Sequence, residues 1–150
     1  PMGRTGLYLA LWIGLGTVTG SLYGLWSRRF GRKRVFLTSL GGATICLFII
    51  GFSTSQVWSV TALVLFGGFM LMTYPSLHTF VGSTVKDEEQ TLAFSWVSNI
   101  QLVSGAIITL ICGFLSDLVN IRFPFILTGF FALFIFLFYL PKNEKYFGAK

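Results

Sequence analysis

The sequence predicts an all-α membrane protein in which five helices cross the bilayer. Its 150 residues are 54% hydrophobic and only 11% charged, whereas an ordinary soluble domain is about 25% charged. Eleven Lys and Arg with five Asp and Glu cannot cover the surface of a soluble protein of this length. The same hydrophobicity excludes an intrinsically disordered chain, because disordered chains are poor in apolar residues.

Four stretches without Asp, Glu, Lys or Arg place the spans, at residues 5–27, 35–85, 90–116 and 123–141. A bilayer-spanning helix needs about 20 mostly apolar residues, so the second stretch holds two helices, with the polar run 53–56 as their turn. Barrel strands would instead alternate over about 10 residues. Within one transmembrane domain of residues 1–150, we expect spans at residues 5–26, 35–52, 57–77, 91–115 and 123–140.

The positive charges fix the expected orientation. With five spans, nine of the 11 Lys and Arg lie on one side: five at residues 28–34, Lys86, and three in the tail 141–150. Only Arg4 and Arg122 lie on the other side. Because Lys and Arg concentrate in cytoplasmic loops, we expect a multi-pass protein of the cell membrane with a cytoplasmic C-terminal tail. The net charge of +6 then needs no nucleic acid to explain it.

No arrangement of residues typical of an enzyme active site is visible in the sequence. No Ser/His/Asp set, paired carboxylates or phosphate-binding Gly-x-x-x-x-Gly-Lys-Ser/Thr loop occurs, so we expect neither an enzyme nor a bound cofactor. Cys46 and Cys112 fall inside expected spans and are interpreted as packing thiols, with no metal site. The first apolar run is too long for a cleavable signal peptide.

Residues 24–34, with the sequence GLWSRRFGRKR, form the most informative loop. They resemble the major facilitator superfamily signature G-x-x-x-D-R-x-G-R-R/K. The positions that fit are Gly24, Arg29, Gly31, Arg32 and Lys33. Arg28 stands where the family has Asp. Loss of this Asp is commoner in the second, degenerate copy of the signature, which lies between the eighth and ninth helices. A positively charged topology loop of any multi-pass protein is the alternative interpretation.

Two further loops resemble the same family. The acidic run 86–94 is similar to the loop before its eleventh helix, and a second loop motif, Gly113, Asp117 and Arg122, is similar to its turn into the last helix. The order of these signals implies helices eight to twelve of a twelve-helix transporter, whose N-terminal part would be a partner of this chain. We also expect Pro75 to break the third span near its cytoplasmic end.

Polar side chains gather on the fourth span. Ser95, Ser98, Asn99, Gln101 and Gly105 fall within an arc of about 160° at 100° per residue. Polar residues inside a span usually face a cavity or the bundle interior, so we expect them to line a substrate cavity. Hydrogen bonding between helices is the alternative. Residues 35–52 and 123–140 are apolar all round and are expected to face lipid.

Other residues have simpler expected roles. Gly16, Gly20 and Gly24 recur every four residues, which is typical of closely packed membrane helices. Trp26 and Trp58 lie at expected interfaces with the head groups. His78, the only histidine, could relay protons but is interpreted as interfacial.

The leading functional hypothesis is secondary active transport of a small solute by alternating access. The lipid bilayer would surround the protein. A small membrane protein that does not transport and serves as a packing or assembly subunit is the alternative. A membrane enzyme is the weakest hypothesis, because no catalytic constellation is visible.

Overall fold

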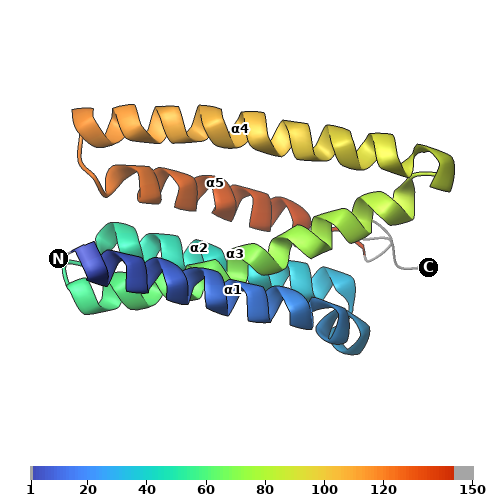
Figure 1. The fold of residues 1–150 in the computed structure, drawn as a ribbon, viewed down its shortest axis with the longest axis horizontal. Coiled ribbons are helices and arrows are strands. Elements are labelled where there is room, and N and C mark those ends of the chain that lie inside the picture. The colour runs from blue at the N-terminus through green and yellow to red at the C-terminus, as the bar shows by residue number, and fades with distance from the viewer. Residues whose placement is uncertain (1, 144–150) are drawn as a thin grey trace.

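The computed structural model describes the backbone of residues 2–143 and the side chains of residues 6–143. Within this range the chain is helical and contains no strand, which confirms the predicted all-α class. The elements are α1 (Met2–Phe30), α2 (Arg32–Phe52), α3 (Gln56–Thr84), the short 3₁₀ helix η1 (Asp87–Glu89), α4 (Gln90–Leu118) and α5 (Phe123–Tyr139). They form a bundle of roughly parallel and antiparallel helices, with α4 along one edge and α5 beside it (Figure 1). The tail beyond residue 143 lies outside the described residues.

Four helices, α1 to α4, are long and apolar enough to cross a membrane. The fifth, α5, has 17 residues, which is close to the lower limit of about 17 for a membrane span. The turn between α2 and α3 lies at residues 53–55, where Ser53 and Ser55 hydrogen bond to each other. The described part of the chain therefore has the helices of a multi-pass membrane protein.

The expected break at Pro75 is wrong, because α3 continues through this residue to Thr84. A proline inside a helix leaves the carbonyl four residues earlier, here that of Leu71, without its usual partner, and the hydroxyl groups that follow Pro75 bond to other carbonyls of the helix. Ser76 donates to the carbonyl of Met72 at 3.3 Å, and Thr79 donates to the carbonyl of Pro75 at 2.7 Å. The helix crosses the bundle and ends beside the start of α4 (Figure 1).

The contact between α1 and α3 is built from glycines. A Cβ atom on Gly16 would lie 2.8 Å from the carbonyl oxygen of Gly67, so no other residue fits without movement. Gly20 similarly faces the backbone of Leu71, at 3.4 Å. Thr19 of α1 donates a hydrogen bond of 2.7 Å to the carbonyl oxygen of Gly68. Small residues on both helices therefore allow the two backbones to approach closely. Gly24, also expected in this face, has open space around it.

The second helix, which was expected to face lipid, is covered by other helices on most of its surface and is exposed along one stripe. Over an 18-residue apolar stretch of each helix, 44% of the residues are buried in α2, against 22% in α3 and none in α4. Its exposed residues follow one stripe, formed by Arg34, Thr38, Ile45, Ile49 and Phe52. Contacts with α1, α3 and α5 cover the other faces. An apolar helix is compatible with lipid and with protein alike, and here protein covers most of it.

Aromatic side chains join α2 to α5 along their length. At one end the rings of Phe36 and Tyr139 meet edge to face at 5.8 Å. Farther along, Phe48 packs on Phe130 at 5.2 Å and against Gly129, where a Cβ atom would lie 3.1 Å from the Phe48 ring. By contrast, α4 has no buried residue, and its main contacts are with α3, α5 and η1.

We expect Gly67→Ala to destabilise the protein by about 1–3 kcal/mol, because the new methyl group would lie 2.6 Å from the carbonyl oxygen of Trp12. Thermal unfolding in detergent can be followed by thiol-reactive labelling of the free cysteines Cys46 and Cys112. Gly14→Ala is the matched control, since nothing lies within 4 Å of its added Cβ atom. Equal unfolding temperatures for the two variants would contradict this account of the α1–α3 contact.

Candidate functional site

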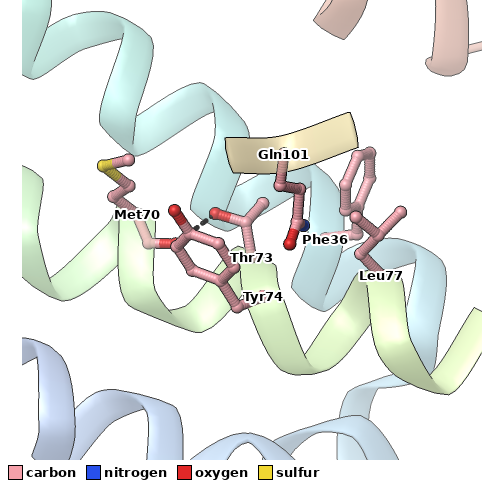
Figure 2. A pocket seen from close by; sticks show the side chains of 6 residues that line it. All are labelled: Phe36, Met70, Thr73, Tyr74, Leu77 and Gln101. Atoms are coloured by element: carbon pink, nitrogen blue, oxygen red, sulfur yellow. Dashed lines mark hydrogen bonds between the residues drawn. The ribbon is translucent and has the colours of Figure 1, made fainter. Parts of the chain in front are cut away.

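A pocket of about 180 Å³ opens between α2, α3 and α4 (Figure 2). We call it the Gln101 pocket, and its lining residues are Phe36, Met70, Thr73, Tyr74, Leu77 and Gln101. One residue comes from α2 and one from α4, whereas four come from α3. The α3 residues are spaced i, i+3, i+4 and i+7, so they share one helical face. Three helices therefore converge on this pocket.

The pocket combines apolar walls with a few neutral polar groups. Figure 2 shows the amide of Gln101 reaching from α4 toward α3. The Thr73 hydroxyl donates hydrogen bonds to the carbonyls of Phe69 and Met70 in its own helix. The side chains of Gln101 and Tyr74, in contrast, have no hydrogen-bond partner among the residues that the structure describes. An amide and a phenol without partners beside apolar walls can bind a solute that offers complementary polar atoms.

The other polar residues of α4 do not reach this pocket. Asn99, Ser95 and Ser98 are exposed, whereas Gln101 is half-buried. Residues two positions apart on a helix point in nearly opposite directions, so Asn99 and Gln101 lie on different faces of α4. The arc of the fourth span thus divides between the Gln101 pocket and the exposed surface of the helix.

Thr73, Tyr74 and Phe36 were not singled out from the sequence as site residues. The helical spacing of residues 70, 73, 74 and 77 indicates a shared helix face, but this face lies in the segment where Pro75 was expected to break the helix.

His78 lies nearby on α3 and is half-buried, with its ring 5.6 Å from that of Phe94 on α4. Trp12 Nε1 is the one buried side-chain nitrogen or oxygen without a partner in the described part of the chain.

The basic loop, residues 28–34, joins α1 to α2. Gly31 adopts φ 88° and ψ 146°, in the region that favours glycine, and it separates the two helices. Arg28 and Arg29 lie in the last turn of α1, where positive charge interacts favourably with the helix dipole. Arg32 and Lys33 begin α2, whose first turn holds no acidic residue. Gly24 lies inside α1 and takes no part in the turn.

Lys33 connects the basic loop to the far end of the chain. Its Nζ atom donates a hydrogen bond of 2.8 Å to the carbonyl oxygen of Leu140, which caps the C-terminal end of α5. The last carbonyl groups of a helix lack partners within the helix, and the dipole makes this end attractive to cations. The ammonium group at the start of α2 therefore stabilises the end of α5 and supplements the contact of Phe36 with Tyr139.

The second loop motif lies at the opposite end of α4. Asp117 is exposed near the end of the helix, and Gly113 has open space around it. The side-chain oxygen of Asn120 accepts a hydrogen bond of 3.1 Å from the backbone nitrogen of Arg122 and so shapes the turn into α5. No ion pair joins Asp117 to Arg122 within the described residues.

Comparison with known proteins decides what these features have in common. Residues 3–149 match the family model of the Major Facilitator Superfamily. The chain belongs to this superfamily. It is also 29% identical over 147 residues to the multidrug resistance protein MdtG of Proteus mirabilis (strain HI4320), and matches its C-terminal part. The alignment covers 93% of this chain but only 35% of that relative.

Membership of the Major Facilitator Superfamily assigns membrane transport at the level of the family. It confirms the resemblance drawn from the basic loop and the loops that follow it. Within the family pattern, this chain departs at Arg28, where the signature has Asp.

We expect Lys33→Met to lower the free energy of unfolding by about 0.5–1.5 kcal/mol, because the carbonyl of Leu140 would lose its charged donor. Hydrogen exchange at the last turn of α5 measures the change locally. Lys33→Arg keeps the cation and should retain slow exchange. If Lys33→Met leaves exchange at this turn unaltered, the contact does not stabilise α5.

Proposed function

We propose that the whole protein is a secondary active transporter that moves a small solute by alternating access. The observation that carries this proposal is the Gln101 pocket, where an amide and a phenol without partners face apolar walls from three helices. Transporters of this kind hold their substrate between helices near the middle of the bilayer. Family membership supports the same function.

We infer two sets of substrate contacts in the complete carrier. Gln101 contacts the substrate from within the pocket. Asn99, with Ser95 and Ser98, lines the translocation path from the exposed face of α4, which the rest of the transporter would complete. The exposure of these three residues and the 35% coverage of the relative support this arrangement.

We further propose that the substrate is a small amphipathic compound. No charged residue lines the Gln101 pocket, and Phe36, Tyr74, Met70 and Leu77 offer aromatic and flexible apolar surface. The relative is named a multidrug resistance protein, which agrees with a pocket that favours apolar contact over precise hydrogen bonding.

A second candidate is a membrane protein that does not transport and assembles with another chain. The observation that favours it is α4, whose exposed apolar side chains have no partner helix on one side within the described residues. A transport assay separates the two candidates, because an assembly subunit would show no transport of its own.

We expect Gln101→Met to raise the KM for a transported dye about 3–10-fold, because one hydrogen bond to substrate is lost while side-chain volume is kept. Export of a fluorescent aromatic dye from cells without other exporters measures this change. Gln56→Met makes the same substitution at an exposed glutamine at the start of α3 and should transport like the parent protein. Equal KM values for the two variants would remove Gln101 from the substrate site. No dye export by the parent protein would contradict the proposed function itself.

We expect single cysteines at Ser55 and Asn120 to react with an impermeant maleimide added outside intact cells. Cysteines at Phe30 and Glu88 should react only after the cells are opened. Nine of the 11 Lys and Arg lie on the same side of the membrane as these two positions, and this side is therefore expected to be cytoplasmic. All four positions are exposed in the structure, so the comparison reports sidedness and not burial. Labelling at Phe30 from outside would reverse the orientation.

A further inference from the structure

A second pocket lies beside the basic loop, where the end of α1 and the start of α2 meet the middle of α3. It encloses about 360 Å³, and its lining residues are Trp26, Phe30, Arg34, Val35, Thr38 and Met72. We call it the Arg34 pocket. It shares no residue with the Gln101 pocket, and neither the family nor the transport proposal assigns it a ligand.

The inner part of the Arg34 pocket is apolar. Val35 and Met72 are only 3% and 4% exposed, and they form one buried cluster with Tyr23. Toward the outside lie two large aromatic side chains, Trp26 and Phe30, which are 38% and 51% exposed. Thr38 also lines the pocket, and its hydroxyl donates hydrogen bonds to carbonyls of its own helix. Apart from the indole N–H group of Trp26, this surface offers a ligand dispersion contacts only.

One guanidinium group lines the pocket, and a second lies over the ring of a lining residue. Arg34 is part of its lining, and the Arg29 guanidinium lies 5.5 Å from the centre of the Phe30 ring. Neither arginine, nor Arg28, forms an ion pair with a carboxylate in the described part of the chain. Guanidinium groups bind phosphate through parallel hydrogen bonds, and they are charged at every accessible pH. The site therefore combines unneutralised positive charge with an apolar interior.

We propose that the Arg34 pocket binds one anionic phospholipid from the leaflet on the side of the basic loop. An acyl chain lies against Met72 and Val35, and the phosphate group binds Arg34 and Arg29. A soluble anion would leave the apolar part unfilled, and a zwitterionic lipid would bring a positive head group beside the two guanidinium groups. Basic pockets between membrane helices are known to suit anionic head groups, which surround such a protein at high concentration.

The test uses Trp26 as a reporter of bound acyl chains, in a variant that keeps this tryptophan and carries Phe at positions 12, 58 and 96. The protein is reconstituted in phosphatidylcholine vesicles with a minor fraction of either brominated phosphatidylglycerol or brominated phosphatidylcholine. We expect brominated phosphatidylglycerol to be enriched about fivefold at Trp26 by the first cation alone, and more by the second. A matched variant that keeps only Trp58, at the other end of the bundle, should be quenched equally by both lipids.

Substitutions identify the groups responsible. Arg34→Gln should remove most of the preference for phosphatidylglycerol, and the double variant with Arg29→Gln should remove all of it. Lys86→Gln is the control, because it deletes one exposed positive charge from the loop between α3 and α4, at the same end of the bundle. An equal loss in Lys86→Gln would mean that general surface charge attracts the lipid, and would overturn the proposal.

Two other outcomes would also overturn it. Equal quenching of Trp26 by the two brominated lipids would show contact with lipid but no anionic site. The absence of quenching by either lipid would show that another part of the protein or a partner chain covers the pocket. Native mass spectrometry of the protein with all four tryptophans provides a measurement that needs no tryptophan substitution, and retained phosphatidylglycerol should fall in Arg34→Gln but not in Lys86→Gln.

Discussion

The close approach of α1 and α3 is the constraint on which the other positions depend. Lipid tails are as apolar as leucine, so helices inside a membrane gain little from the hydrophobic effect and associate through packing and interhelical hydrogen bonds. Here Gly16 and Gly67 bring the two backbones together, and Thr19 adds a hydrogen bond to the carbonyl of Gly68. Once α3 is fixed on α1, its remaining faces are available to α2 and α4.

Both candidate binding sites follow from the position of α3. One face of this helix presents Met70, Thr73, Tyr74 and Leu77 to the Gln101 pocket, while Met72 points into the cluster beneath the Arg34 pocket. The two pockets also share α2, since Phe36 contributes to the first and Val35 to the second. Adjacent residues of a helix point about 100° apart, so α2 and α3 can separate two sites of different chemistry.

The basic loop has more than one structural consequence. Gly31 provides the backbone conformation that ends α1 and begins α2. The loop then directs Lys33 to the end of α5 and places Arg34 at a pocket between α1, α2 and α3. A loop whose charge was first interpreted as a signal for membrane orientation thus also holds the last described helix and lines a cavity.

The sequence alone determined that the chain is helical and membrane-embedded, where its apolar runs lie, and which transporter family it resembles. Length, charge and hydropathy are sufficient for these conclusions, because a bilayer excludes charged side chains and unpaired backbone groups. Only the tertiary structure showed that α2 is buried, that α3 continues through Pro75, and that Gln101 enters a pocket while Asn99 stays exposed. It also revealed the contact of Lys33 with Leu140, which are 107 residues apart. An apolar side chain is about as stable against lipid as against another helix. Hydropathy therefore identifies a span but does not decide which of its faces packs against other helices.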